Sequence, residues 1–312
     1  MSKIVHPHLI QAYAIIIVDC KAYLIMPLML YGDLKNILSF KFLKGIHDEN
    51  VLATIMKYCL EAIDCLNNNN LFHRDIKASN ILLDKDGSIR LGDYGVSSLI
   101  KKEGNNTFVG SICWMAPEIA LNLEYTYKID IWSLGITAIE IANGKAPYKD
   151  LSINEFIEES KSPHLPSLND DIYKFSDEFK NFIKNCLVKD PKLRPSAKEL
   201  LENHKKFLDK AKNQEYIVEN VLKGCLDLHQ IFPKILNEKE QYFVKSENNA
   251  EGLNKMESKT SGDIDDEFNV DEKIDDGRED KSTGFLGPLK RELNKKHNDL
   301  KGMFDMNEED CE

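Results

Sequence analysis

Short apolar runs near the start of the chain predict β-strands. β-Branched and aromatic residues fill 12–18 and 22–26, and a three-residue turn separates the two runs. Two such runs with a short connection are typical of an antiparallel hairpin. Further along, short apolar runs at 71–72, 81–83 and 89–91 also predict strands, and Asp86 and Gly87 form a tight turn between the last two.

Longer segments have the spacing of helices. Apolar residues recur every three or four positions between Asp48 and Asn67, which predicts an amphipathic helix. Asp33 is placed to cap a short helix that runs to Leu38. Later helical patterns cover 129–143, 153–160, 176–187 and 197–203. Strands come first and helices follow, so we expect an α+β fold in which a small strand-bearing part leads into a helical lobe.

Apolar residues become isolated beyond residue 237, where Asn, Asp, Glu, Lys, Ser and Gly dominate. The stretch 247–281 holds 13 acidic and 5 basic residues, so it carries eight of the eleven excess negative charges of the chain. Such a segment cannot bury enough apolar surface to offset its chain entropy. We therefore predict that residues 237–312 form a disordered acidic tail.

The composition also argues against several classes of protein. The short basic run Lys205, Lys206, Lys210 and Lys212 is interpreted as a solvated helix face rather than a nucleic-acid patch, so no nucleic-acid partner is expected. The seven cysteines form no CxxC pair, which favours reduced thiols over a disulfide framework or a zinc site. The longest apolar stretch, 131–142, is interrupted by polar residues and is too short for a bilayer, and the first residues lack the apolar region of a signal peptide. We expect a cytoplasmic protein with no membrane partner.

The strongest chemical signal is the nonapeptide FHRDIKASN at residues 72–80. Asp75 can accept a proton from a hydroxyl group, Lys77 can reach a transferring phosphate, and the amide oxygen of Asn80 is a hard ligand suited to Mg²⁺. An ordinary charged loop is the alternative. The spacing HRD-x-K-x-x-N, followed at once by the apolar run 81–83, argues strongly against that alternative.

A second acidic motif follows thirteen residues after Asn80. In the sequence GDYG, Asp93 is a candidate for the main Mg²⁺ ligand, and Gly95 permits the backbone turn that would aim its carboxylate. Tyr94 stands where phenylalanine is usual in such motifs. The added hydroxyl needs a polar partner or water, and we treat it as a mild departure.

Three further sequence motifs follow the two described above. They are TFVGSICWMAPE at 107–118, DIWSLGITAIEIANGKAPY at 130–148 and AKNQEYIVENVL at 211–222, and Arg194 lies between the last two. With these motifs, residues 1–225 resemble the sterile-20-like serine/threonine protein kinases. Within that family they are most similar to the oxidative-stress-responsive, Ste20-related proline/alanine-rich subgroup.

The resemblance implies a protein kinase-like fold and an activity. Residues 1–30 would be a remnant of the kinase N-lobe, 31–208 the C-lobe, 209–236 a helical extension and 237–312 the tail. The implied function is transfer of the γ-phosphate of ATP to serine and threonine hydroxyls of proteins, in a stress or signalling cascade. ATP and Mg²⁺ are the implied cofactors, and the implied partners are protein substrates and an upstream activating kinase.

The resemblance assigns chemical roles to single residues. It makes Asp75 the catalytic base, Lys77 the lysine that neutralises the phosphate, and Asn80 and Asp93 the two metal ligands. The adenine of ATP is expected against four apolar side chains: the gatekeeper Met26, the hinge residues Leu28 and Met29, and Leu82 beneath the ring.

Other residues receive structural or regulatory roles. Glu118 and Arg194 match a buried ion pair, and Asp130 matches the residue that hydrogen-bonds the catalytic-loop backbone. Ser111 would join the base and the lysine in a hydrogen-bond network. Thr107 aligns with an activating threonine, and a phosphate there could pair with Arg74, which precedes the catalytic base.

Some expected parts are missing from the sequence. No glycine occurs before Gly32, and Lys3 and Lys21 are the only lysines before Met26, so the glycine-rich loop and the strand lysine of a kinase are not found. We expect the chain to begin roughly 70–90 residues after the usual start of the family. A longer natural protein is one interpretation. The other is a short, catalytically weak kinase-like scaffold or pseudokinase-type binding module, and as given the chain is expected to bind ATP·Mg weakly.

Another departure concerns Ile112, which stands where this subgroup commonly has proline. The substitution is expected to change substrate preference around the acceptor residue.

Overall fold

The computed structural model describes residues 4–18, 21–93, 112–169 and 171–230. The chain divides into two units, Met1–Asp227 and Leu228–Glu312. Only residues 228–230 of the second unit are among those described, so the fold below is that of the first unit. The tail predicted at 237–312, Tyr94, Gly95, Thr107 and Ser111 lie outside the described residues.

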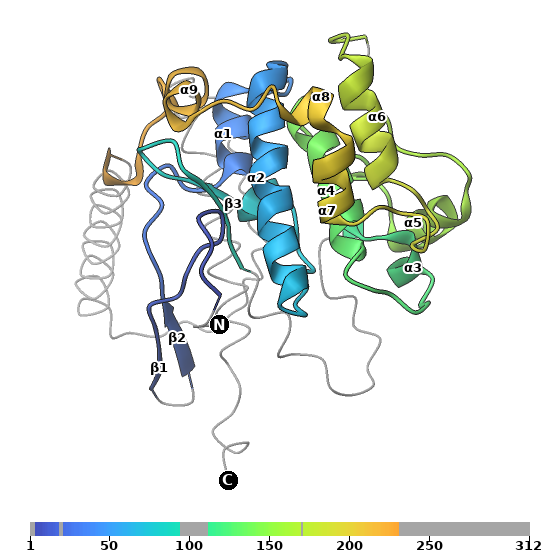
Figure 1. Ribbon diagram of the computed structural model, residues 1–312, viewed down its shortest axis with the longest axis horizontal. Coiled ribbons are helices and arrows are strands. Elements are labelled where there is room, and N and C mark those ends of the chain that lie inside the picture. The colour runs from blue at the N-terminus through green and yellow to red at the C-terminus, as the bar shows by residue number, and fades with distance from the viewer. Residues whose placement is uncertain (1–3, 19–20, 94–111, 170, 231–312) are drawn as a thin grey trace, which may run out of the picture. The chain divides into compact units, whose positions relative to one another are not determined.

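The N-terminal hairpin is confirmed. Strands β1 (Ala14–Val18) and β2 (Lys21–Ile25) pair antiparallel, with Ala14 opposite Ile25 and Ile16 opposite Tyr23. Figure 1 shows this hairpin at one edge of the unit, away from helices α3 to α8. Large apolar side chains on both of its faces are exposed, among them Ile15, Ile16, Ile17 and Tyr23.

A second hairpin lies at the centre of the unit. Strands β3 (Ile81–Leu83) and β4 (Ile89–Leu91) pair antiparallel, as predicted, and Gly87 in their turn has a left-handed φ of 82°. Helix α1 (Leu34–Lys41) begins at Asp33, whose Oδ1 accepts a hydrogen bond from the amide of Asn36 at 2.9 Å. The prediction of a strand at 71–72 is wrong. The backbone of Leu71 is hydrogen-bonded to the end of α2 instead: its amide donates to Leu66 O, and its carbonyl accepts from Asn67 Nδ2.

The helices follow the predicted periodicity closely. Helix α2 is Glu49–Asn68 and α4 is Ile129–Asn143, and both predicted spans match to within a residue. The remaining α-helices are α3 (Pro117–Ala120), α5 (Ile153–Lys161), α6 (Asp177–Cys186), α7 (Ala197–Asn203), α8 (Lys205–Leu208) and α9 (Gln214–Ile217). Short 3₁₀ turns occupy Ala78–Asn80 and Ile112–Trp114, and a π-helical turn occupies Val218–Leu222.

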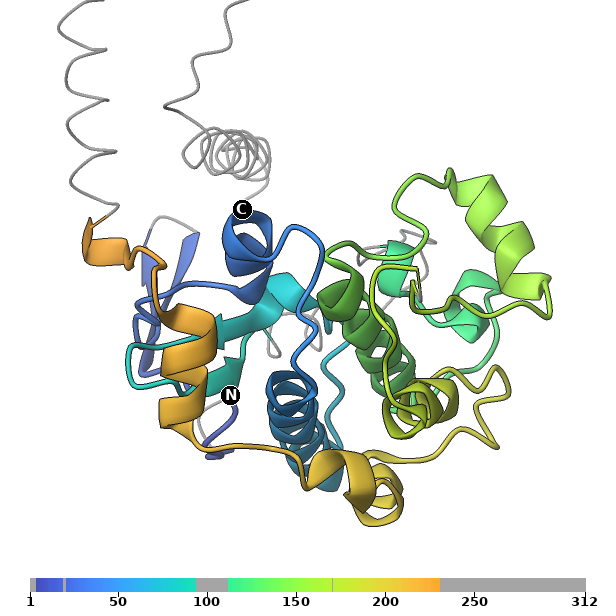
Figure 2. The same cartoon turned by 90° about the horizontal axis from the view of Figure 1, so that it is seen from above.

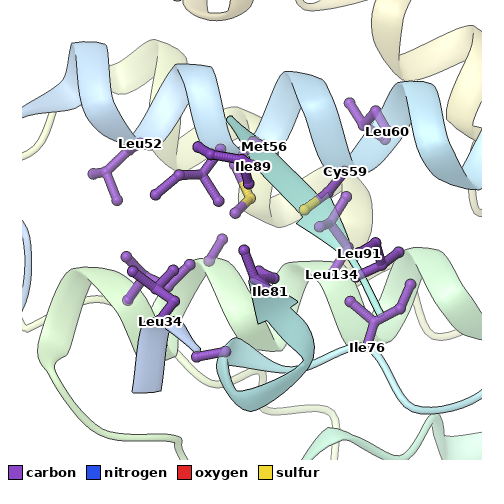
Figure 3. Packing of buried hydrophobic residues seen from close by; sticks show 14 of the residues in the cluster. Leu34, Leu52, Met56, Cys59, Leu60, Ile76, Ile81, Ile89, Leu91 and Leu134 are labelled. Carbon is purple, nitrogen blue, oxygen red and sulfur yellow. The ribbon is translucent and has the colours of Figure 1, made fainter. Parts of the chain in front are cut away.

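The core forms where α2 meets the central hairpin and α4. Leu52, Met56, Cys59 and Leu60 repeat at helical spacing along α2 and are buried. Figure 3 shows them facing Ile81, Ile89 and Leu91 of the hairpin and Leu134 of α4. Burial of such side chains supplies most of the driving force for folding, roughly 1.5–3 kcal/mol for each fully buried leucine or isoleucine.

The segment after α8 wraps back over this core. The amide of Lys212 donates to Thr54 Oγ1 at 2.8 Å, and Tyr216 donates its hydroxyl to Asp48 at 2.7 Å. Figure 2 shows α9 beside the β3–β4 hairpin, and a Cβ on Gly87 would lie only 2.2 Å from the carbonyl oxygen of Gln214. These helical turns fall within the predicted extension 209–236.

Helix α4 lies against α6 so closely that Gly135 cannot carry a side chain. A Cβ there would lie 2.7 Å from Cys186 Cβ and 2.8 Å from Leu187 Cδ2. Gly135→Ala is therefore expected to lower the free energy of unfolding by about 1–3 kcal/mol through overpacking. Helix propensity alone predicts the opposite sign, a gain of about 0.5–1 kcal/mol. Urea unfolding distinguishes the two, and a stabilised variant would contradict the close packing.

Candidate active site

Three of the residues predicted to carry the chemistry, Asp75, Lys77 and Asn80, lie on the segment between α2 and β3. Lys77 Nζ lies 2.7 Å from Asp75 Oδ2, and Asn80 Nδ2 donates to the same oxygen at 2.9 Å. Asn80 Nδ2 also lies 2.6 Å from the backbone carbonyl of Asp75. One carboxylate oxygen therefore joins the three side chains, and the Asp75 and Lys77 side chains both remain partly exposed.

The amide nitrogen of Asn80 faces Asp75. Both of its hydrogen bonds to Asp75 use the amide nitrogen, which directs Oδ1 away from Asp75. Its backbone carbonyl accepts from the amide of Gly92 at 2.8 Å, so Asn80 lies beside the residue that precedes Asp93. Two hard oxygen donors on these neighbouring segments are a donor set that fits Mg²⁺, with the remaining positions left for phosphate and water.

His73 connects the loop to the same place. It is buried, and burial lowers its pKa to about 4 because the interior disfavours the imidazolium ion. His73 Nδ1 accepts a hydrogen bond from the amide of Asp75 at 3.3 Å. In the neutral ring the proton therefore lies on Nε2, which donates to Gly92 O at 2.6 Å. The loop and the end of β4 are thereby tied together.

Two loop residues have unusual backbone conformations. Arg74 has a φ of 70° and Asp93 a φ of 58°, in the left-handed region that non-glycine residues rarely adopt. Each of these conformations costs on the order of 1 kcal/mol and persists only where neighbouring contacts hold the backbone. Such strained residues are concentrated at functional sites. The Arg74 guanidinium lies 5.1 Å from the centre of the Phe72 ring.

Four polar side chains of helix α4 face the loop and the turn Ile112–Trp114. Asp130, Ser133, Thr137 and Glu140 are spaced three, four and three residues apart, so they share one face of a helix whose other residues are mostly apolar. All four are buried. We call them the α4 polar stripe.

The first member of the stripe binds the loop backbone, and the third, whose hydroxyl donates to Ser133 O at 2.7 Å, lies beside it. Asp130 accepts the amides of His73 and Arg74, each at 2.8 Å, and Thr137 Oγ1 lies 3.3 Å from Ile76 O. Burial raises the pKa of Asp130 to about 6, although both amide hydrogen bonds favour its ionised form. These contacts place Asp130 against the backbone of the loop between α2 and β3.

The sequence motifs gave a role to Asp130 alone and missed the other three members of the stripe. Glu140 Oε2 accepts the Ala78 amide at 3.0 Å and the Trp114 indole N–H at 2.9 Å, and Ser133 Oγ donates to Trp114 O at 2.8 Å. Burial raises the pKa of Glu140 to about 7. The available signal was a charged residue on the polar face of an otherwise apolar helical pattern. The Trp114 indole N–H thus has a specific acceptor in Glu140.

Glu118 and Arg194 form a buried bidentate pair. Nη1 and Nη2 lie 2.7 and 2.9 Å from the two carboxylate oxygens, and the exposed fractions of the side chains are 2% for Glu118 and 0% for Arg194. Arg194 also donates to the carbonyls of Val188 and Lys128, and its guanidinium lies 5.2 Å from the Trp132 ring centre. The pair joins α3 to the loop before α7.

The four residues predicted to contact adenine lie on or beside the segment that joins β2 to α1. Met29 is buried, Leu28 is exposed, and Met26 and Leu82 are partly buried against the core. The Tyr31 amide donates to Leu83 O at 3.1 Å, which pairs this segment with β3. The structure thus places Leu82 next to the segment that carries the other three.

Within the described ranges, no helix has the length and apolar character needed to cross a membrane. The same ranges contain no group of three or more His, Cys, Asp and Glu side chains that could hold a metal.

Comparisons with known proteins agree with the motifs. Residues 1–207 match the family model described as the protein kinase domain. The chain is 39% identical over 226 residues to serine/threonine-protein kinase fray2 of Dictyostelium discoideum, covering 71% of this chain and 22% of that protein. It is 36% identical over 247 residues to germinal center kinase 3 of Caenorhabditis elegans, covering 72% of this chain and 41% of the relative.

A relative from Schizosaccharomyces pombe is also a serine/threonine-protein kinase. Serine/threonine-protein kinase ppk11 of Schizosaccharomyces pombe is 40% identical over 200 residues, covering 64% of this chain and 62% of that protein. The chain thus spans between 22% and 62% of the length of these three relatives. The prediction of a kinase-like α+β fold is confirmed.

Proposed function

Because the chain belongs to the protein kinase domain family, we propose that it transfers the γ-phosphate of ATP to serine and threonine hydroxyls of proteins. The observation that carries the proposal is the meeting of Lys77 Nζ and Asn80 Nδ2 at Asp75 Oδ2. The carboxylate of Asp75 is the base, and the Lys77 ammonium and the Asn80 amide meet at one of its oxygens. Phosphoryl transfer needs an oriented hydroxyl and neutralised phosphate charge, and little covalent help from the protein, so this arrangement suits it.

Each side chain has a separate task in this proposal. Asp75 accepts the proton of the substrate hydroxyl at its carboxylate, and Lys77 balances negative charge on the transferring group. Asn80, through Oδ1, and Asp93, through its carboxylate, hold Mg²⁺. Bound ATP·Mg supplies the phosphoryl group and part of the charge neutralisation.

The nucleotide base is proposed to lie over Leu82. Met26, Leu28 and Met29 would line its other sides, on the segment that pairs with β3. Glu118, Arg194 and Asp130 would act indirectly, by fixing the segments on either side of the reacting groups.

We also propose that the protein belongs to the sterile-20-like signalling kinases of the oxidative-stress-responsive type and acts in the cytoplasm. The relatives fray2 and germinal center kinase 3 support only the sterile-20-like part of this assignment. An upstream kinase would phosphorylate Thr107, and the phosphate would pair with Arg74. Ser111 would join Asp75 and Lys77 at the site.

Phosphoamino-acid analysis tests the reaction type. The purified 312-residue protein is incubated with radiolabelled ATP·Mg and a mixed protein substrate. Phosphate is expected on serine and threonine, because a lysine two residues after the base is typical of kinases with that specificity. A product that is mainly phosphotyrosine would contradict the assignment.

A kinase-like binding module is the second candidate. One sequence feature bears on it: residues 1–31 contain no glycine, whereas protein kinases usually cover the phosphates of ATP with a glycine-rich loop. Titration calorimetry combined with the transfer assay separates the two functions. Binding of a protein ligand with no phosphoryl transfer under any condition would favour the module.

A further inference from the structure

A groove of about 340 Å³ lies between α6 and the segment 165–168. Figure 1 shows α6 at the outer edge of the unit, on the side away from the β1–β2 hairpin. The residues that α6 and its C-cap contribute to the groove are spaced three, one and three positions apart, so they share one face of the helix: Lys180, Ile183, Lys184 and Leu187. The volume is within the usual range of binding clefts, roughly 300–1,000 Å³.

The groove offers apolar surface to a partner. Ile183 and Leu187 are buried, and they lie across from Leu165, whose exposed fraction is 38%. Pro166 and Leu168 add further apolar atoms to the wall. Covering such a surface with an apolar side chain removes more of it from water and is favourable.

The charge of the groove is basic. Lys180 and Lys184 line it, and no acidic side chain of the described residues does. Lys184 is in the last turn of α6, and its ammonium has no ion-pair partner within the described ranges. This charge favours an acidic partner. It disfavours an isologous contact between two copies of the chain, because such a contact would bring the same lysines together.

The wall of the groove also has open backbone donors. In the part of the chain that the structure describes, the amides of Leu165, Ser167 and Leu168 donate no hydrogen bond. Extended peptides commonly bind along a backbone segment of this kind, where main-chain hydrogen bonds supply affinity and side-chain pockets supply specificity.

We propose that this groove docks an extended acidic segment of a partner protein that carries two apolar side chains two residues apart. The spacing follows from the floor of the groove. Ile183 and Leu187 are separated by four residues, about 6 Å along the helix axis. Alternate residues of an extended chain point to the same side and lie roughly 6.6 Å apart, so two of them match the floor.

The remaining contacts of the segment are polar. Its acidic side chains pair with Lys184, and its carbonyls accept from the amides of Leu165 and Ser167. The proposal does not depend on phosphoryl transfer, because none of these residues belongs to the proposed catalytic site.

Peptide display on the full 312-residue chain tests the class of ligand. A library of random heptapeptides is depleted on Lys184→Glu and then selected on the unsubstituted protein. Enriched sequences are expected to carry apolar residues at positions i and i+2 with Asp or Glu beside them. Basic sequences, or no enrichment, would overturn the proposal. Sequences that match residues 237–312 would assign the groove to the chain's own tail and would also overturn it.

Fluorescence anisotropy with the most enriched peptide measures what each side of the groove contributes. Lys184→Glu and Leu165→Ser are each expected to raise Kd about tenfold or more. The matched changes Lys198→Glu and Leu193→Ser, at exposed positions outside the groove, should leave Kd unchanged.

A charge-swapped peptide separates direct pairing from a damaged fold. When lysine replaces each acidic residue of the peptide, affinity for Lys184→Glu should return, which a misfolded variant could not produce. Failure of the swapped peptide to bind, or equal losses in the two control variants, would contradict the proposed docking.

Light scattering of the peptide-free chain checks for self-association through the groove. The mass is expected to be the same for the unsubstituted protein and for Lys184→Glu. A larger mass that Lys184→Glu abolishes would assign the groove to a second copy of the chain and overturn the proposal.

Discussion

Replacing Arg194 by alanine is expected to lower the free energy of unfolding by about 3–5 kcal/mol. The loss is large because Glu118, the partner of Arg194, remains buried in the variant. Glu118 is 2% exposed, and the variant leaves its carboxylate in the interior without the two guanidinium hydrogen bonds at 2.7 and 2.9 Å. The carbonyls of Val188 and Lys128 lose a donor as well.

Urea unfolding measures the effect, and an exposed ion pair on α5 serves as the control. Lys161 and Glu158 lie 2.7 Å apart with side chains 53% and 73% exposed, so Lys161→Ala should change stability by less than about 1 kcal/mol. Replacing both buried partners by apolar residues, Glu118→Leu with Arg194→Met, should recover much of the loss because no charge is left buried. Similar small losses for Arg194→Ala and Lys161→Ala would contradict this account.

Local patterns predicted the elements that carry the site. The helix at 129–143 and the strands at 81–83 and 89–91 have the predicted bounds, because apolar periodicity and turn residues act over a few positions. Asp33 caps α1 as expected for the same reason. Asp75, Lys77 and Asn80 could be grouped from sequence because all three lie within six consecutive residues.

Partners that are distant in the sequence could not be predicted in the same way. The sequence shows a glutamate at position 140 in an apolar helix, but its hydrogen bonds go to Ala78 and Trp114, which only tertiary packing brings together. The same holds for His73 and the carbonyl of Gly92. The predicted strand at 71–72 failed because the end of α2 took the backbone groups of Leu71, and β-propensity of a two-residue run cannot outweigh that contact.

The second large effect is expected from Asp75→Asn, a change that keeps the shape of the site. The asparagine oxygen can still accept from Lys77 Nζ and Asn80 Nδ2, which now lie 2.7 and 2.9 Å from Asp75 Oδ2. The contacts of the loop to α4 do not involve Asp75, so the loop should keep its conformation. They are made by His73, Arg74, Ile76 and Ala78. An amide, however, cannot take up the proton of a hydroxyl.

Phosphoryl transfer by Asp75→Asn is therefore expected to fall about 10²–10⁴-fold, the usual contribution of a general base. Because the Asp75–Lys77 pair is partly exposed, the free energy of unfolding should change by less than about 1 kcal/mol. Radiolabelled phosphate incorporation measures the first quantity and urea unfolding the second. Asp209→Asn, at an exposed position just after α8, carries the same chemical change away from the loop and should leave both unchanged. Transfer that persists at the original rate in Asp75→Asn would rule out Asp75 as the base, or would show that the activity belongs to a co-purifying kinase.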